Sequence, residues 1–140
     1  MTDDERRAFL TGRPARTGKL ATTRADGRPH VAPIWYDLGD DGAVVFTTGA
    51  ESLKGKALRR DPRVCLCVDD ETPPFSFVIV EGTAKLSEDL DELLVWATRI
   101  AGRYMGDDQA EAYGRRNAVS GELLVRVVPS HVVAHAGITD

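Results

Sequence analysis

The sequence is poor in several features, and each shortage disfavours a class of protein. Its 140 residues contain only two cysteines, Cys65 and Cys67, two positions apart in the stretch VCLCV. Such neighbours in a strand share a face, rarely form a disulfide and do not make a zinc site by themselves. We therefore expect buried, unreactive thiols and no metal. No apolar run approaches the roughly 20 residues that a membrane span needs, so no membrane partner is expected.

Targeting signals and excess positive charge are also missing. The N-terminus, MTDDERRAFL, opens with acids and has no apolar segment of the kind that a secretory signal carries, so the cytoplasm is the expected location. The formal net charge is -4. An acidic chain disfavours a broad nucleic-acid surface, and we expect no nucleic-acid partner.

Well-known functional motifs are absent. The sequence contains no G-x-x-x-x-G-K-[ST], no G-x-G-x-x-G after a strand, no H-E-x-x-H, no C-x-x-C and no G-x-S-x-G. These absences argue against a P-loop nucleotide-binding protein, a Rossmann dinucleotide-binding protein, a zinc protease and an α/β-hydrolase with a nucleophile elbow. His131 and His135 are four positions apart, but in an extended strand they would lie about 13 Å apart, which is too far to share one metal ion.

Apolar runs separated by turn signals predict a mainly β, α+β fold in a single domain over residues 1–140. Six strands in so short a chain would leave open edges, and closing them into an antiparallel barrel removes those edges. We expect the long helix to plug one end of this barrel, the first three strands to form a meander, and a bulge at Pro129. The expected strands cover residues 18–24, 30–38, 43–48, 64–68, 75–86 and 122–135. The expected helices cover residues 3–10, 51–60, 87–100 with a serine N-cap, and 107–117, with glycines 102 and 106 interrupting the third.

The stretch TTGAESLKGKALRRDP, residues 47–62, concentrates positive charge in this acidic chain. It holds Lys54, Lys56, Arg59 and Arg60, and no acid follows Glu51 within the helix. Like charges four positions apart weaken a helix, so an uncompensated cluster favours an external anion over a merely solvated face. The helix N-terminus adds unpaired N–H groups, and Thr47, Thr48 and Ser52 add hydroxyls. Together these groups predict a phosphate site.

Several motifs resemble one family when they are taken in order. LATT, DGRP, HVAPIW, VFTT and SLKGKALRRDP, followed by VEGTAKL, are similar to the pyridoxamine 5'-phosphate oxidase-like split-barrel superfamily over about residues 15–137. The closing VPSHV, residues 128–132, resembles the ending of an actinobacterial branch that uses the deazaflavin coenzyme F420.

This resemblance implies a six-stranded FMN-binding type of split β-barrel with peripheral helices, assembled as a homodimer with cofactor sites at the interface. It implies an oxidoreductase that transfers a hydride between the deazaflavin and a small organic substrate. The implied cofactor-binding residues are His30, Val31, Ala32 and Pro33 beside the ring, Thr47 and Thr48 near the ribityl chain and phosphate, Ser52, Lys54 and Lys56 at the phosphate and tail, and Phe75 against the ring from the partner subunit.

Two alternatives remain: an FMN-binding oxidoreductase of the same fold, and a non-catalytic protein that stores F420. The surplus cations favour F420, because its tail carries carboxylates as well as a phosphate. Leu53 stands where the oxidase proper carries an arginine, and the C-terminal AHAGITD lacks the oxidase's basic segment. True pyridoxamine phosphate oxidase activity is therefore not expected. Pro33 also lacks the backbone N–H that some relatives offer to the ring.

No catalytic side chain stands out from the sequence. Tyr36, His30 and Tyr104 are candidate proton donors, although barrel packing or a dimer contact is the more ordinary role for Trp35 and Tyr36. Trp96 has helical spacing with Leu93 and Ile100 and is expected in the core. The arginines that could guide an anionic substrate are expected to face solvent instead: Arg103, Arg115 and Arg116.

Overall fold

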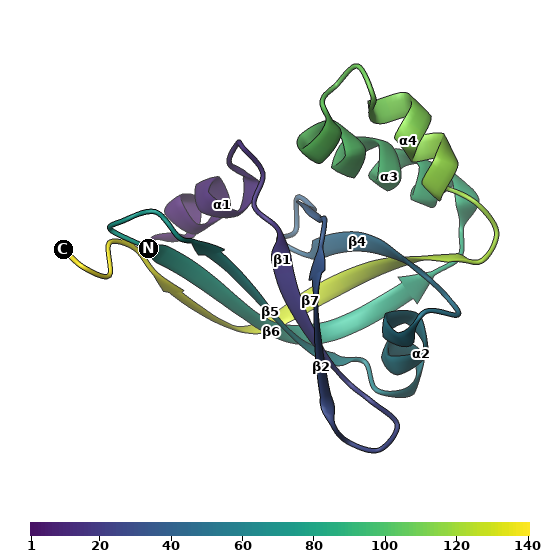
Figure 1. Cartoon of the computed structure of the whole chain (residues 1–140), viewed down its shortest axis with the longest axis horizontal. Helices are drawn as coiled ribbons and strands as arrows, with labels where there is room; N and C mark the ends of the chain where they lie inside the picture. Colours follow the sequence, from purple (N-terminus) through teal and green to yellow (C-terminus); the bar gives the residue numbers. More distant parts are fainter.

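The computed structural model describes residues 1–140 as one curled antiparallel sheet of seven strands with four helices around it (Figure 1). This is the split-barrel architecture that the sequence predicted, with seven strands in place of six. The elements in chain order are α1 (Asp3–Thr11), β1 (Gly18–Thr23), β2 (Pro29–Ile34), β3 (Asp37–Leu38), β4 (Val44–Gly49), α2 (Leu53–Arg60), β5 (Arg63–Asp70), β6 (Ser76–Ser87), α3 (Leu90–Met105), α4 (Ala110–Asn117) and β7 (Glu122–His135).

The connection between β2 and β3 forces the sheet to curl. The strand order is β2-β1-β5-β6-β7-β4-β3, so β2 and β3 form opposite edges. Only Trp35 and Tyr36 separate these strands in the chain. From Ile34 to Asp37 an extended chain reaches at most about 11 Å. The two edges must therefore approach each other, which closes the sheet into a half-barrel.

The expected strand over residues 30–38 and the expected meander were wrong. β1 pairs with β2 as anticipated, with Leu20 opposite Ala32. β4, however, pairs with β3 and β7 and has no pairing with β2. The strand divides because Trp35 and Tyr36 carry the chain from one sheet edge to the other. Sequence proximity alone could not show that two consecutive segments lie at opposite edges.

The expected bulge in the last strand is confirmed. Along the β6–β7 ladder, Glu81 lies opposite His131 and Gly82 lies opposite Pro129. Ser130 is the additional residue, and its hydroxyl donates to the Glu81 carbonyl at 3.2 Å. Proline cannot donate to a ladder, so the irregularity falls beside it.

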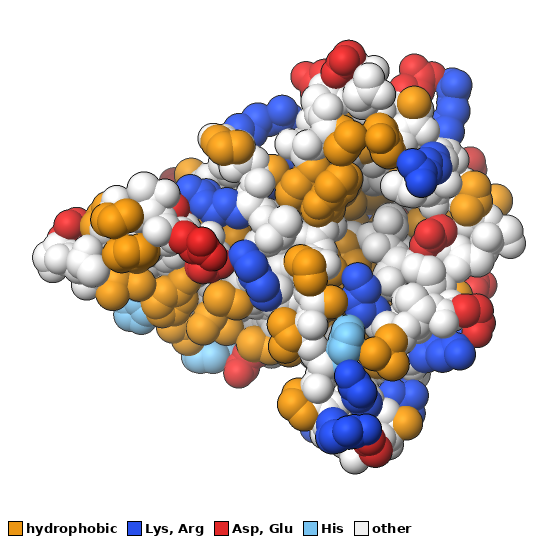
Figure 2. Space-filling view, viewed as in Figure 1, with side chains coloured by type: hydrophobic (Ala, Val, Ile, Leu, Met, Phe, Trp, Pro, Cys, Tyr) orange, Lys and Arg blue, Asp and Glu red, His pale blue; other side chains and the backbone are white.

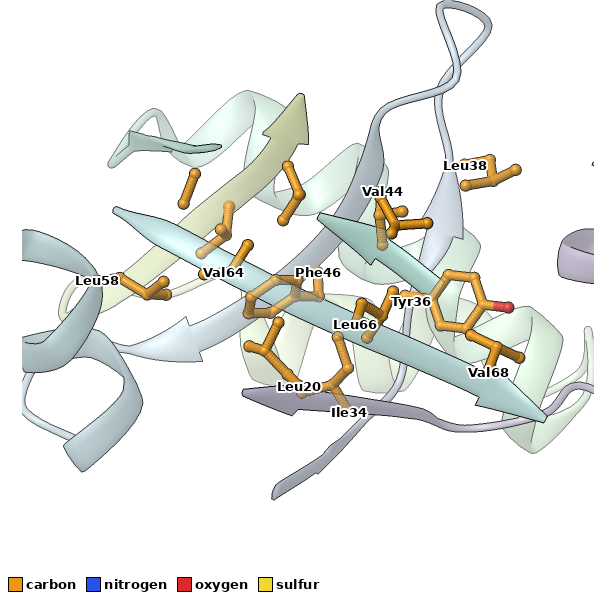
Figure 3. Packing of buried hydrophobic residues seen from close by; sticks show 14 of the residues in the cluster. Leu20, Ile34, Tyr36, Leu38, Val44, Phe46, Leu58, Val64, Leu66 and Val68 are labelled. Carbon is orange, nitrogen blue, oxygen red and sulfur yellow. The ribbon is translucent and has the colours of Figure 1, made fainter. Parts of the chain in front are cut away.

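Inward-facing side chains of the strands form a core cluster of 18 buried residues (Figure 3). Leu20, Phe46 and Leu66 are fully buried there. The helices contribute Leu10 from α1 and Leu58 from α2 to this cluster. Burial of such side chains contributes about 1.5–3 kcal/mol each relative to exposure, so the filled interior stabilises the barrel.

The long helix α3 does not plug the barrel, contrary to expectation. Leu93 and Trp96 pack against Val45 and Leu124, which point outward from β4 and β7, in a separate buried cluster. The core position expected for Trp96 is confirmed. Because β4 is buried on both faces, α3 covers the outer side of the sheet and provides one wall of a surface hollow.

The start of α3 also differs from expectation. Its N-cap is Asp89, whose carboxylate accepts hydrogen bonds from the N–H groups of Asp91 and Glu92 at 2.9 and 3.0 Å. Ser87 still belongs to β6. The helix passes through Gly102 without a break and ends at Gly106, where φ is 98°. None of the four helices has the length and apolar character required to cross a membrane.

Candidate active-site hollow

The turn before α2 is shaped by hydroxyl groups. The Ser52 hydroxyl accepts from the Gly55 N–H at 3.0 Å and donates to the Gly49 carbonyl at 2.7 Å. The Thr48 hydroxyl lies 3.2 Å from that of Ser52 and is buried. These two hydroxyls therefore hold the turn and the helix cap. Both hydroxyl protons are therefore engaged within the chain, and the expected role of Thr48 and Ser52 in holding a phosphate stays a prediction.

Anion-binding capacity remains at the backbone of α2. The N–H groups of Leu53 and Lys54 have no acceptor within the helix and no other partner in the chain. Unpaired N–H groups and the helix dipole make this end positive. The first turn of α2 also contains no acid. The start of this eight-residue helix is thus suited to an anionic group.

Two of the four cations in α2 have acidic partners, so the expectation of an uncompensated cluster was wrong for them. The Lys56 Nζ lies 3.7 Å from a carboxylate oxygen of Glu51. The Arg59 guanidinium lies 2.8 Å from the carboxylate of Glu88, at the end of β6. Glu88 is 29 positions away in sequence, so only the fold could reveal this partner.

The other two cations differ from each other. Arg60 is exposed and donates to the Thr23 carbonyl at 3.3 Å. Lys54 is half-buried and makes no ion pair or hydrogen bond through its side chain, and its burial lowers the pKa of its ammonium group. Lys54 is therefore the cation of α2 without a partner of any kind.

Lys54 lines a hollow of about 330 Å³ on the outside of the barrel. The space-filling view shows a depression between α3–α4 and the region of α2 and β2, with hydrophobic side chains along its wall (Figure 2). Residues from α3 and the end of β2 make the wall apolar, and residues near the start of α2 make one end polar. The lining residues are Pro33, Ile34, Trp35, Thr47, Lys54, Ala97, Ile100, Ala101, Asn117 and Glu122.

Sequence reasoning missed Glu122, the acid of this hollow. Glu122 opens β7 and lies opposite Gly49 in the β4–β7 ladder. Burial raises the pKa of its carboxyl group, and its Oε2 atom is buried without a hydrogen-bond partner. Nothing in the sequence marks this acid, because its position depends on the long-range pairing of β4 with β7.

The four residues expected beside the cofactor ring lie on both faces of the edge strand β2. Val31 is 63% exposed and Pro33 is exposed, whereas His30 and Ala32 are half-buried. Of the four, only Pro33 lines the hollow. The Nδ1 atom of His30 is buried and has no hydrogen-bond partner. Alternation along the strand separates these residues, as a period of two requires.

Phe75 lies far from the hollow within one chain. It sits in the turn between β5 and β6, where its φ is 60° and its N–H donates to the Thr72 carbonyl at 2.9 Å. Figure 1 shows this turn and α2 at opposite ends of the sheet. A single chain therefore does not bring Phe75 to the hollow, and its expected role in a partner subunit's site stays a prediction.

Two of the three candidate proton donors have structural hydrogen bonds. The Tyr36 hydroxyl donates to the Leu10 carbonyl at 2.7 Å, and burial raises its pKa to about 12. The Tyr104 hydroxyl donates to the Arg16 carbonyl at 2.7 Å and accepts from the Tyr36 N–H, and burial raises its pKa too. The Tyr104 ring stacks on Trp35 at 4.9 Å. Neither hydroxyl is placed to give a proton to a ligand.

The expectation that Arg103 faces solvent was wrong. Its side chain is only 6% exposed and donates to the carbonyls of Tyr36 and Leu10. Its guanidinium also lies 3.7 Å from the carboxylate of Asp37. It therefore ties α3 to α1 and to the β2–β3 link. Arg115 and Arg116 are exposed as expected.

The cysteines face outward, contrary to the expectation of buried thiols. Val64, Leu66 and Val68 point into the core, which leaves Cys65 and Cys67 half-buried on the outer face of β5. Both thiols are free, and burial raises the pKa of each. No group of three His, Cys, Asp or Glu side chains is arranged to hold a metal ion, and His131 and His135 are exposed in β7.

Comparisons with known proteins agree with this architecture. The model of the pyridoxamine 5'-phosphate oxidase family matches residues 2–132. A 5a,11a-dehydrotetracycline/5a,11a-dehydrooxytetracycline reductase from Streptomyces rimosus is 29% identical over 75 residues. That match covers 49% of this chain and 53% of the reductase, so the chain spans about half the length of this curated relative.

Solved structures show the same fold. A conserved hypothetical protein from Mycobacterium tuberculosis is 31% identical, with a TM-score of 0.82, over 96% of this chain and 84% of the other. An F420 reductase is 23% identical, with a TM-score of 0.68, over 90% and 94% of the two chains. A heme storage protein from Vibrio cholerae is 18% identical, with a TM-score of 0.73, over 99% and 98%. At such low identity the last two likenesses show the fold alone.

The family match covers nearly the whole chain, and the curled antiparallel sheet with its outer helices accounts for that match in three dimensions. The chain therefore belongs to the pyridoxamine 5'-phosphate oxidase family.

Proposed function

We propose that this protein is a reductase that uses the deazaflavin coenzyme F420 and acts on a small organic substrate. The observation that carries the proposal is Lys54, a half-buried cation without a partner, in a hollow with an apolar wall. When bound, the deazaflavin would supply hydride transfer. The residues of this chain would bind it, orient it and exclude water from it.

The polar end of the hollow suits the anionic part of such a cofactor. The free N–H groups of Leu53 and Lys54 and the Lys54 ammonium can hold a phosphate. Arg60 lies farther along α2, is exposed, forms no ion pair, and offers positive charge to a carboxylate-bearing tail. A flavin mononucleotide lacks such a tail, so this cation favours the deazaflavin.

The apolar wall suits a planar ring. Pro33, Trp35 and Ile100 line the hollow with hydrophobic surface. Trp35 is 43% exposed and is held in place by its stacking on Tyr104. Pockets for small molecules are commonly apolar with a few polar groups that fix orientation. His30 lies three positions before Pro33 in β2, and with its buried and unpartnered Nδ1 it stays a candidate proton donor.

The proposal does not include pyridoxamine phosphate oxidation. Leu53 occupies the first position of α2 and is 46% exposed, where the oxidase proper carries an arginine. An alkyl side chain cannot replace a guanidinium in binding a phosphate-bearing substrate. Two relatives are named as reductases, and this favours an enzyme over a storage protein.

A binding titration tests the proposal. We would follow cofactor fluorescence while adding apo-protein to the deazaflavin and, separately, to FMN, at two salt concentrations. Tight binding of the deazaflavin that weakens with salt is the expected result, because the contacts are charge-based. Preference for FMN would overturn the choice of cofactor. Tight deazaflavin binding with no turnover of any unsaturated carbonyl or quinone would point to storage instead.

We also propose that two copies form a homodimer with the cofactor sites at the interface. On the outer face of β1, β5 and β6 the side chains of Ala21, Cys65 and Ile79 are only half-buried. Val31 on the neighbouring edge strand is 63% exposed. A second copy seated on this face would cover these side chains and could bring its own Phe75 toward the hollow.

Analytical ultracentrifugation measures whether the protein forms this dimer in solution. The wild-type chain of 15.2 kDa should sediment as a dimer of about twice that mass. Ile79→Arg places a charge on the exposed sheet face and should shift the protein to monomer. Asp108→Asn makes the same change in net charge at an exposed site before α4 and should leave the dimer intact. A monomeric wild type, or a dimer unaffected by Ile79→Arg, would contradict the proposal.

A further inference from the structure

Glu122 lies beside the turn that precedes α2. The Ala50 N–H donates to the Gly121 carbonyl at 2.8 Å, which ties the turn before α2 to the start of β7. In the ladder, Glu122 lies opposite Gly49, and its own N–H donates to the Val119 carbonyl at 3.1 Å. These backbone hydrogen bonds fix the main chain of Glu122 on both sides, and its carboxyl group therefore lies in the polar part of the hollow.

The hollow contains two side chains of opposite charge, Lys54 and Glu122, that do not neutralise each other. Lys54 and Glu122 both line it, yet they form no ion pair, and each is perturbed only by burial. No other charged side chain lines the hollow. The buried Oε2 of Glu122 has no donor. A buried acceptor left unpaired costs free energy, and a ligand donor would recover it once the carboxyl group turns this oxygen toward the hollow.

We propose that Glu122 is a specificity-determining residue: its carboxyl group accepts a hydrogen bond from an O–H or N–H group next to the ligand's anionic group. The hollow would then select hydroxyl-bearing phosphate esters over phosphate esters without a hydroxyl. The inference rests on the proposed function, in which Lys54 and the first N–H groups of α2 hold the anion.

The charges at this end explain how the selection works. An anion held by Lys54 and the start of α2 lies in the same hollow as the Glu122 carboxyl group, which repels it. A ligand with a hydroxyl on the atom next to its anionic group would donate a charge-assisted hydrogen bond to the Glu122 carboxyl group, and this bond would offset the repulsion. The residue thus favours one class of ligand by binding it and disfavours another by repulsion.

A matched pair of small phosphate esters tests the inference without any cofactor. Glycerol 3-phosphate and n-propyl phosphate have the same number of carbon atoms and the same ionic group, and only the first carries hydroxyls. We would measure both dissociation constants by NMR titration of the full chain. Wild type should bind glycerol 3-phosphate about tenfold more tightly, as one additional hydrogen bond provides.

Variants at the two positions separate the possible outcomes. Glu122→Leu should abolish the preference, whereas Glu122→Gln, which keeps an acceptor oxygen but loses the charge, should retain only part of it. Lys54→Ala should weaken both esters alike. A preference that survives in Glu122→Leu, or no preference in wild type, would overturn the role of Glu122 alone. If wild type bound neither ester, the anion site at Lys54 would be overturned together with this inference.

Discussion

At the scale of single residues, Lys54 and Lys56 look alike in sequence but differ in surroundings. Lys56 is exposed and lies 3.7 Å from Glu51. Lys54 is half-buried and has no partner. A partly desolvated ammonium group gains more from an incoming anion than an exposed one, because water screens the exposed charge. The two lysines therefore form a natural pair of test and control.

Replacing Lys54 should weaken binding of the deazaflavin. Lys54→Ala removes a charge-assisted hydrogen bond and should cost about 1.5–3 kcal/mol of binding free energy. Lys56→Ala should cost less than about 1 kcal/mol, since its charge is exposed. Fluorescence titrations of both variants under the same salt conditions measure the difference. Equal losses for the two variants would show that the hollow beside Lys54 is not the anion site.

Sequence patterns indicated the region of the site better than its individual residues. They singled out the helix that contains Lys54 and the strand that contains Thr47, and both line the hollow. They could not rank Lys54 above Lys56, because the difference depends on burial and on Glu51. They missed Glu122 altogether, because a single acid after Gly121 carries no local signal.

At the scale of the elements, α2 packs unusually closely on the turn that precedes it. Gly55 is buried, and a Cβ atom at its position would collide with the carbonyl oxygen of Gly49 and come within 2.9 Å of that of Ala50. These are backbone atoms, which cannot move aside as a flexible side chain can. Glycine at this position therefore sets how closely the start of α2 approaches the β4 end.

Adding a methyl group at Gly55 should push α2 away. Gly55→Ala should lower the free energy of unfolding by about 2 kcal/mol or more, despite the better helix propensity of alanine. Gly49→Ala is the control, because a Cβ there meets nothing closer than 3.9 Å, and it should cost less than about 1 kcal/mol. Urea denaturation of both variants gives the comparison. A Gly55→Ala variant as stable as wild type would disprove the close approach.

Most elements were predictable because their signals are local. Proline after Asp61 ends α2, and alternation of apolar residues marks β5 and β6. The wrong predictions concern segments in which a local sequence signal conflicts with the pairing of strands distant in the chain. Ser87 resembles a helix cap but stays in β6 because it pairs with Leu124 of β7. The segment 30–38 resembles one strand, but it is divided between β2 and β3, which form the two opposite edges of the sheet.

At the scale of the whole molecule, one network joins the closure of the sheet to two helices. Tyr36 lies in the two-residue link between β2 and β3, is fully buried, and donates to the Leu10 carbonyl of α1. Arg103 of α3 donates to the carbonyls of both residues. Loss of this network would weaken the closure of the sheet between β2 and β3 and, at the same time, the attachment of α1 and α3.

The ionisation of Tyr36 should make the fold sensitive to high pH. Its pKa rises from 10.0 to about 12 because burial disfavours the phenolate. The unfolded chain therefore loses this proton first, and stability should fall as the pH rises from about 10 to about 12, by about 2–3 kcal/mol in total.

Comparison with Tyr36→Phe isolates this contribution. The variant lacks the hydroxyl, so it should be less stable at neutral pH but should lose less stability between pH 10 and pH 12. Denaturation curves at a series of pH values measure both effects. Identical losses in the two proteins over this range would assign the alkaline sensitivity to other groups.

The sequence by itself determined the kind of fold and the order of most elements, and it singled out α2 as the helix where we propose that an anion binds. These follow from alternation, turn residues and helix signals, which act over a few neighbouring positions. Only the tertiary structure decided that β2 and β3 lie at opposite edges, that Arg59 is neutralised by Glu88, and that Lys54 shares a hollow with Glu122. The physical reason is that partners, burial and closure are set by contacts between residues distant in the chain.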